Sequence, residues 1–309
     1  MRLILPLLAA LLLVGCDFED LGPSDRYRAE FHYTLKPTDR LSVENFNGEI
    51  EVAGWDEPSI EVTGTRYAAT QENLDNIKID IHESAGLTEI RTVHPETFHG
   101  NQGARYLIRA PRQTLLDRVV SSNGSVRVHD MTAVARIHTS NGPIRVENVK
   151  GGVDAETSNG AIDLDSVTGK LNLHTSNGRI RAEELTGACE AETSNGSVTL
   201  RYKDSPDGTV HIHTSNGSVE VTMTQSPKNG VRAETNNGSI TMDLPGNTAA
   251  RLNAQTSESI SSDFDVMDGA NSDHEKHHLE GNIGAGGPLI DLSTHNGGIR
   301  LRKSATSTN

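Results

Sequence analysis

The sequence is poor in the residues that fill a large globular core. Hydrophobic residues make up 34% of the chain and aromatic residues 4%, and the single tryptophan is Trp55. A thick core would need more leucine and phenylalanine than this, whereas a thin core repeated many times would not. The 29 glycines suit a chain with many tight corners.

Positive charge is also scarce. The chain has 28 Lys and Arg against 42 Asp and Glu, so the net charge is −14 at pH 7. Nucleic-acid binding needs a basic face, so we expect no nucleic-acid partner. The sequence also lacks a glycine-rich phosphate loop, a Cys-x-x-Cys pair and a nucleophile elbow, and we expect no cofactor.

The first residues have the pattern of a secretory signal peptide. Arg2 precedes an apolar run from Leu3 to Val14, which is too short to span a bilayer comfortably. The run ends in LVGC, which resembles the lipobox of bacterial lipoproteins, in which the peptide is cut before the cysteine and its sulfur carries a diacylglycerol. An ordinary signal peptide with a chance cysteine is the alternative. We expect a lipidated Cys16, because the cysteine stands where cleavage is expected.

A lipid at Cys16 would hold the protein on a membrane, because each buried methylene adds about 0.8 kcal/mol. The expected location is therefore the bacterial envelope, on a periplasm-facing membrane or at the cell surface. Residues 1–15 would be the lipoprotein signal peptide and residues 16–29 a flexible tether. Cys189 would then have no disulfide partner.

A strict repeat occupies the middle of the chain. Asn-Gly pairs recur every eighteen residues and then at spacings of twenty-one, and a degenerate copy, Thr256-Ser257-Glu258, precedes the closing pair. Apolar and polar residues alternate on both sides of each pair, as half-buried strands require. The expected structural corners are Asn123-Gly124, Asn141-Gly142, Asn159-Gly160, Asn177-Gly178, Asn195-Gly196, Asn216-Gly217, Asn237-Gly238 and Asn296-Gly297, with an early relative at Asn47-Gly48.

Asn-Gly between alternating strands is also typical of a type I′ hairpin, which would make an antiparallel meander. The constant spacing, with the same residues recurring at each corner, favours stacked coils instead. We therefore predict an all-β, right-handed parallel β-solenoid with coils of 18–21 residues and two short strands per coil. At the corners we expect Asn and Gly in positive-φ conformations, with Asn side chains bonded along the column.

The residue before each repeated Thr supports the same choice. It alternates strictly between histidine and glutamate along the series His138, Glu156, His174, Glu192, His213, Glu234. In a parallel solenoid equivalent positions lie about 4.8 Å apart, so this alternation avoids stacked like charges. The resulting ladder is a solvated face or, as a functional alternative, a stripe that binds divalent metal or responds to pH.

We expect residues 30–117 to form an irregular N-terminal β region, residues 118–302 the repeat solenoid, and residues 303–309 a disordered tail. The segments NGEIEVAGWDEPSIEVTG, YLIRAPRQ, the serial TSNG corners and the closing GNIGAGGPLIDLSTHNGGIRLRK resemble the bacterial putative-adhesin family. That family is a domain of unknown function built as a β-solenoid, and the resemblance runs from about Phe31 to Lys303. It implies a non-enzymatic envelope protein, with some relatives acting in envelope-stress responses, and it offers no agreed catalytic residues.

Two patterns could carry chemistry. The segment from His274 to His278 satisfies the His-Glu-x-x-His pattern of zinc proteases, which requires a helix, but its flanks are rich in Gly, Asn and Asp. We expect a solvated loop and no metal site, with His274, His277 and His278 as weak metal candidates. The second pattern is a file of outward residues on a β-helix, where polysaccharide lyases and hydrolases carry their sites: Arg145, Asp163, Arg181, Thr199, Glu220 and Thr241.

That file is mixed in charge and lacks aromatic residues for stacking on a sugar. The sequence therefore favours a non-enzymatic, lipid-anchored β-solenoid that acts as a binding or structural module for a protein or glycan. A polysaccharide-acting enzyme and a metal-binding surface protein are the alternatives.

Overall fold

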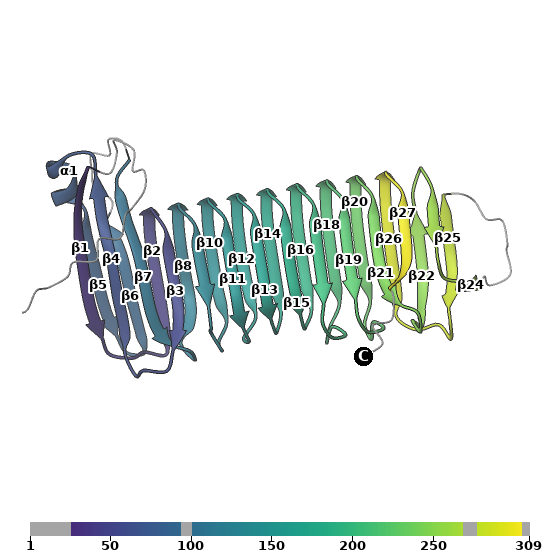
Figure 1. The fold of residues 1–309 in the computed structure, drawn as a ribbon, viewed down its shortest axis with the longest axis horizontal. Coiled ribbons are helices and arrows are strands. Elements are labelled where there is room, and N and C mark those ends of the chain that lie inside the picture. Colours follow the sequence, from purple (N-terminus) through teal and green to yellow (C-terminus); the bar gives the residue numbers. More distant parts are fainter. Residues whose placement is uncertain (1–25, 94–100, 268–276, 305–309) are drawn as a thin grey trace, which may run out of the picture.

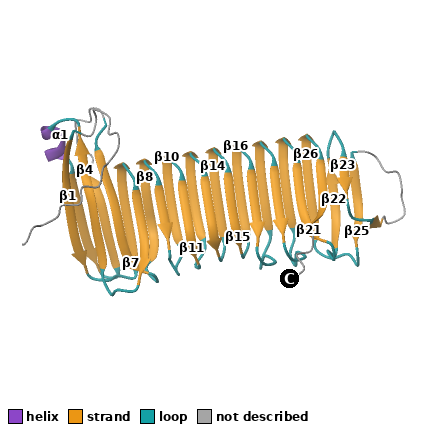
Figure 2. Cartoon of the chain, viewed as in Figure 1, coloured by secondary structure: helices purple, strands orange, loops and turns teal. Residues whose placement is uncertain are grey.

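The computed structural model describes residues 26–93, 101–267 and 277–304, which form two long β-sheets lying face to face (Figures 1 and 2). Sheet A has 13 strands and sheet B has 14. The one helix of the described residues, α1 (Gln71–Asn76), lies beside β1 (Tyr27–Leu35) and β4 (Ile60–Ala68) at the N-terminal end. Among the described residues, no helix is long and apolar enough to span a membrane.

Each repeated coil contributes one strand to each sheet. The strands of sheet A in the repeat are β9 (Val126–His129), β11 (Ile144–Val149), β13 (Ile162–Val167), β15 (Ile180–Leu185), β17 (Val198–Tyr202), β19 (Val219–Met223) and β21 (Ile240–Pro245). Those of sheet B are β8 (Leu115–Asn123), β10 (Ala135–Asn141), β12 (Val153–Asn159), β14 (Leu171–Asn177), β16 (Cys189–Asn195), β18 (Val210–Asn216) and β20 (Val231–Asn237).

Equivalent strands of successive coils pair in parallel, which confirms the predicted solenoid. Ile144 lies opposite Ile162, and Thr139 lies opposite Thr157. The later coils up to β20 and β21 keep this register, apart from a shift between β15 and β17 after Ala182. A meander would have placed neighbouring strands antiparallel. The right-handed sense of the winding stays a prediction.

The core is thin and continuous, as the composition indicates. The coil that begins at Ile162 buries five apolar side chains, Ile162, Leu164, Val167, Leu171 and Leu173, each no more than 3% exposed. Each fully buried side chain favours folding by roughly 1.5–3 kcal/mol. One coil alone would leave both of its edges unpaired, so coils stabilise one another.

The predicted positive φ angles occur at only some of the Asn-Gly corners. Gly48 (113°), Gly238 (159°) and Gly297 (151°) have them, whereas the glycines from Gly124 to Gly217 do not. Left-handed residues also occur at the opposite corner, at Asn148 (53°), Ser166 (55°) and Glu184 (52°). Close packing explains the glycines: a Cβ at Gly160 would lie 2.0 Å from the carbonyl oxygen of Gly142 in the coil below.

The coils at the C-terminal end do not stack in chain order, contrary to the simple series that the sequence indicates. The last coil, β26 (Leu289–Asn296) and β27 (Ile299–Ser304), lies between β20 and β21 on one side and β22 (Ala250–Gln255) and β23 (Ile260–Ser262) on the other. The intact corner at Asn296 therefore stacks on Asn237, and the degenerate corner at Thr256 follows it. Figure 1 shows the late strand β26 beside β20. Beyond them, β25 (His278–Ile283) and β24 (Val266–Met267) finish sheet B.

The N-terminal end is threaded in a similar way. The coil of β2 (Arg40–Asn47) and β3 (Ile50–Trp55) lies directly against β8 and β9, so Asn47 is in register with Asn123. Strands β6 (Leu87–Val93) and β7 (Gly103–Pro111) lie outside it, and β5 (Lys78–Ser84) and β4 lie further out.

Two of the expected boundaries shift by a few residues. Strand β1 begins at Tyr27, inside the segment expected to be a tether, because residues 27–29 pair with β4. Strand β27 runs to Ser304, inside the expected tail, because Lys303 and Ser304 continue the pairing with β21. Residues 1–25 and 305–309 lie outside the described residues.

Candidate functional surfaces

The asparagines of the corners form a ladder along one edge of the solenoid. From Asn141 onward, each Nδ2 donates to the Oδ1 of the asparagine in the preceding coil of the stack, at distances between 2.7 and 3.0 Å. We call this the asparagine ladder; its members are Asn123, Asn141, Asn159, Asn177, Asn195, Asn216, Asn237 and Asn296. The predicted bonding along the column is therefore present, and it gives the protein a straight polar ridge.

The threonines beside the ladder are structural. Thr157 is 1% exposed, and its hydroxyl donates to the carbonyl oxygen of Gly142 at 3.1 Å. Thr175 and Thr193 make the same bond to the glycine of the coil below, each at 3.0 Å. These hydroxyls satisfy the carbonyls that the close stacking of glycines buries, so they are not free to act as nucleophiles.

The structure brings the alternating histidines and glutamates of sheet B together. His138, Glu156, His174, Glu192, His213 and Glu234 occupy successive register positions on the outer face. We call this set the His–Glu column. Its close pairs join a histidine Nδ1 to a glutamate Oε2: His138 to Glu156 at 3.4 Å, His174 to Glu192 at 3.5 Å and His213 to Glu234 at 3.8 Å.

These side chains are substantially exposed, so each pair contributes no more than about 1 kcal/mol to stability. A divalent metal would need a third ligand, and the described residues contain no group of three or more His, Cys, Asp or Glu placed to hold one. The column is a regular surface stripe of alternating imidazole and carboxylate groups.

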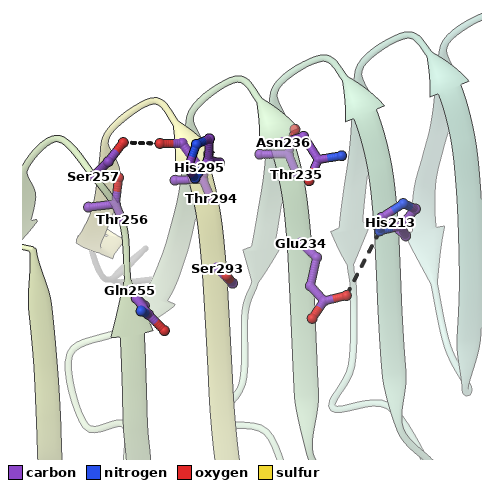
Figure 3. A pocket seen from close by; sticks show the side chains of 10 residues that line it. All are labelled: His213, Glu234, Thr235, Asn236, Gln255, Thr256, Ser257, Ser293, Thr294 and His295. Atoms are coloured by element: carbon purple, nitrogen blue, oxygen red, sulfur yellow. Dashed lines mark hydrogen bonds and ion pairs between the residues drawn. The ribbon is translucent and has the colours of Figure 1, made fainter.

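A shallow polar depression lies where the column ends (Figure 3). The inserted coil places Ser293 next in register after Glu234, and Gln255 follows it. Because serine is much shorter than histidine or glutamate, the surface falls away into a hollow of about 410 Å³. Hydroxyl and amide groups dominate its lining, which includes Thr256, Ser257 and His295. Such a lining suits a neutral polar ligand better than an apolar one.

The opposite corner of the solenoid carries the extra residues of the two coils in which the Asn-Gly spacing is twenty-one. Residues 203–208 and 225–230 lie on each other, with Gln225 donating to Asp204 at 3.0 Å and Asn229 donating to the Pro206 carbonyl at 3.1 Å. The Ser205 hydroxyl accepts from the Lys228 amide at 3.2 Å. We call these two segments the insertion ridge. It is ordered by its own hydrogen bonds.

The outer face of sheet A is a network of ion pairs. Asp163 accepts from Arg179 at 3.2 Å, and Arg181 lies 2.9 Å from Glu183. Asp165 accepts from the Ser166 hydroxyl at 2.6 Å. The hollow among them measures about 230 Å³. Acid–base catalysis needs two carboxyl groups facing across a substrate, whereas Asp163 and Asp165 stand side by side on one strand.

Cys189 is a core residue, as expected from its inward position. It is 2% exposed, and burial raises the pKa of its thiol to about 12, which leaves it unreactive at neutral pH. Its neighbour is the Tyr202 hydroxyl, whose pKa burial also raises well above the usual value. Among the described residues that hydroxyl has no nitrogen or oxygen partner, and it rests against the thiol, which is a weak partner.

The histidine-rich segment is partly visible. His278 begins strand β25 and lies 3.8 Å from Glu280, so the backbone is extended from this residue on. His274 lies outside the described residues, and His277 is described only as a turn residue. The protease pattern requires its second histidine, His278, to lie on a helix, whereas His278 begins a strand.

The comparisons with known proteins agree with this architecture. A family model described as Toastrack DUF4097 matches residues 34–230. The chain belongs to this family. The match to the Toastrack family confirms the resemblance to a domain of unknown function, and it ends before the inserted coil. No curated protein matches the chain.

Solved structures similar to this Toastrack chain include a putative adhesin from Bacteroides fragilis, at 13% identity and a TM-score of 0.45, covering 90% of this chain and 98% of that one. A putative lipid binding protein from Parabacteroides distasonis has 12% identity and a TM-score of 0.43, covering 91% and 98%. Identities this low concern the fold alone.

Two features of the surface were not predicted from the sequence. The depression at the end of the His–Glu column exists because Ser293 is inserted beside Glu234, and only the stacking order shows this. The ordered N-terminal edge strands were expected only as irregular coils. The alternating run of Tyr27–Leu35 was the available signal for β1.

Proposed function

We propose that this Toastrack protein is a non-enzymatic binding module, held in the bacterial envelope by a lipid on Cys16. The observation that supports it best is the form of the described surface. Its polar groups stand in long, exposed, regular rows, and the two hollows described above are shallow and polar. Extended rows of this kind suit contact with a large or repeating partner, as on other solenoids.

The lipid anchor is tested by metabolic labelling with a radioactive fatty acid. The chain should take up label and partition with membranes, and Cys16→Ser should lose both. Cys189→Ser is the matched control, because that thiol is buried in the core. Labelling that survives Cys16→Ser would contradict the anchor.

The proposed partner surface is the insertion ridge together with the polar depression. Both interrupt the regular coils, and variable corners on a solenoid are where partners commonly bind. Deleting residues 204–207 should abolish capture of the native envelope partner, a protein or a glycan, in a pull-down, while circular dichroism stays β-like. Retained capture would exclude the ridge.

The enzymatic alternative is separable by experiment. A polysaccharide panel should yield no reducing sugar and no unsaturated product, and release of either would replace this proposal. The metal alternative is tested with zinc titrations, in which His174→Ala in the His–Glu column should change nothing. A role in envelope stress would follow if deletion of the gene altered a stress reporter.

A further inference from the structure

The two ends of the solenoid are finished differently. At the C-terminal end, sheet A closes with β23 and sheet B with β24, which have 3 and 2 residues, and Phe264, only 7% exposed, completes the core. At the N-terminal end the outermost strands are β1 in sheet A and β5 in sheet B, with 9 and 7 residues (Figure 1). No described strand lies outside these two, so the side chains between them meet solvent.

The side chains that the N-terminal end shows to solvent are apolar. Alternation along β1 turns its apolar and aromatic residues inward, and Ile79 and Ile81 of β5 pack on the core while staying partly exposed. Tyr33 is 37% exposed, with its ring 6.0 Å from that of Phe31. We call this set the N-terminal end face; its members are Tyr27, Phe31, Tyr33, Leu35, Ile79 and Ile81.

Helix α1 covers only one part of this end. Its Leu74 packs in a small cluster with Ile77, Ala68 and Ala29. That cluster contains no residue of β1 beyond Ala29, and the remaining inward residues of the strand lie outside it. The helix therefore leaves most of the N-terminal end face open.

Exposed apolar side chains are concentrated at this end of the solenoid. Six large hydrophobic residues are exposed among the described residues, and the outer three strands of each sheet at the N-terminal end hold four of them: Tyr27, Tyr33, Val93 and Leu107. The other two, Met267 and Leu289, lie three strands apart in sheet B. Grouped apolar exposure of this kind marks a surface that contacts a protein or a membrane.

The chain enters the structure at this same end. Cys16 stands ten residues before Arg26, the first described residue, so the intervening chain spans at most about 35 Å. Sheet A, with its 13 strands, extends roughly 58 Å at the usual spacing between strands. A lipid on Cys16 would hold the N-terminal end close to the bilayer, and a contact made under so short a tether needs little affinity of its own.

We propose that the N-terminal end face rests on the headgroup layer of the bilayer that anchors Cys16, so that the solenoid stands upright on the membrane. The inference rests on the lipid anchor proposed above. Tyrosine suits this layer, because its ring is apolar while its hydroxyl stays hydrated. The open edges of β1 and β5 favour a shallow contact, since their backbone groups would lack partners in hydrocarbon.

A solenoid lying on its side would press charged rows against the bilayer instead. The outer face of sheet A carries ion pairs such as that of Asp163 with Arg179, and the outer face of sheet B carries the His–Glu column. Removing such groups from water is costly. Strands β1 and β5 together carry two basic and three acidic residues, so their charges nearly balance and the end-on contact depends on apolar groups.

The test uses the full lipidated chain in vesicles of phosphatidylethanolamine and phosphatidylglycerol that contain a lipid with a spin-labelled headgroup. A single added cysteine carries the environment-sensitive fluorophore NBD, placed by Thr34→Cys on β1 or by Ser261→Cys on β23, the last strand of sheet A. Both positions are exposed, and the buried Cys189 does not compete for the label. Fluorescence at position 34 should shift to the blue and be quenched, whereas fluorescence at position 261 should do neither.

The tyrosines are tested in the same assay. Tyr27→Ser combined with Tyr33→Ser should remove most of the shift and quenching at position 34, while the lipid still carries the protein with floating vesicles. Met267→Ser is the matched control at the far end, where the side chain is 60% exposed, and it should change nothing. Circular dichroism confirms that each variant is folded, and the comparison of positions 34 and 261 does not depend on the tyrosine variants.

The outcomes separate the contact from the anchor. A chain that does not float with vesicles would remove the lipid anchor, and this inference with it. Flotation with equal quenching at positions 34 and 261 would overturn the end-on contact alone. A blue shift at position 34 that appears without vesicles and grows with protein concentration would show that a second copy covers the end face, and it would overturn the proposal as well.

Discussion

The two corners of each coil solve the same problem, reversing the chain, by different means. At the Asn-Gly corner the residue pair and the length of the turn are constant, because glycine stacks on glycine with no room for a Cβ and the asparagine side chains form hydrogen bonds along the edge. At the opposite corner the turn is made with left-handed residues such as Asn148 and Ser166, and the length changes from coil to coil. Regularity is required only where backbones touch.

The largest expected difference between the two corners comes from replacing a glycine with alanine at each of them. In Gly160→Ala the Cβ would lie 2.0 Å from the Gly142 oxygen, so neighbouring coils must separate, and we expect a loss of more than about 3 kcal/mol in unfolding free energy. Gly246→Ala is the matched control at the opposite corner, where nothing lies within 4 Å, and it should be neutral or stabilising by up to about 1 kcal/mol. Urea unfolding measures both. Equal effects would remove the distinction between the corners.

A smaller effect should follow from removing one hydroxyl beside the asparagine ladder. Thr157→Val keeps the shape but removes the 3.1 Å bond to the Gly142 carbonyl, so we expect a cost of about 1–2 kcal/mol. Ser158→Ala changes the exposed next residue and should cost almost nothing. Thermal unfolding of the two variants compares them directly, and similar melting temperatures would show that the buried hydroxyls are dispensable.

The opposite corner should tolerate a change in the core beneath it. Tyr202→Phe removes a buried hydroxyl that has no nitrogen or oxygen partner among the described residues, so the free energy of unfolding should stay the same or rise by up to about 1 kcal/mol.

The neighbouring thiol of Cys189 should be unreactive in the folded chain, because a pKa of about 12 leaves almost no thiolate at pH 8. Iodoacetamide should label Cys189 only after unfolding, and rapid labelling of the native chain would contradict this burial.

The smallest effect concerns pH. Hydrogen bonds from His129 and Asn148 lower the pKa of Asp130, a left-handed residue at the variable corner. A lowered folded pKa adds stability above the unfolded value of about 3.9, and that stability is lost as pH falls through the folded value. Asp130 is partly exposed, so Asp130→Asn should cost only a few tenths of a kcal/mol at pH 7. The difference from wild type should vanish in acid unfolding curves near pH 2. A difference that persists there would assign the effect to shape instead of charge.

Much of the repeat could be predicted from its pattern. Period-two alternation identified the inward residues such as Ile162 and Leu164, and the recurring corner word indicated parallel stacking, because only stacked coils place identical residues in register. The His–Glu alternation pointed to the same geometry. These signals are local or strictly periodic, so a single sequence contains them.

The order of the end coils could not be predicted in the same way, because alternation identifies strands but not their neighbours. One signal was present in hindsight. The corner at Thr256-Ser257-Glu258 lacks both asparagine and glycine, so it cannot extend the asparagine ladder on both sides, whereas Asn296-Gly297 can. Positive φ angles were expected at every Asn-Gly corner because tight corners favour them, whereas from Gly124 to Gly217 close contact between stacked coils dictates the glycine instead.

The position of the final coil has a consequence for biogenesis. Strands β22 and β23 cannot reach their native neighbours until residues 289–304 have been made and delivered, since that stretch lies between them and the rest of the stack. A polypeptide made from its N-terminus would therefore hold an unfinished end until residues 289–304 emerge. Chains that stop before residue 289 would leave β20 and β21 without these neighbours and would expose their edges to proteases.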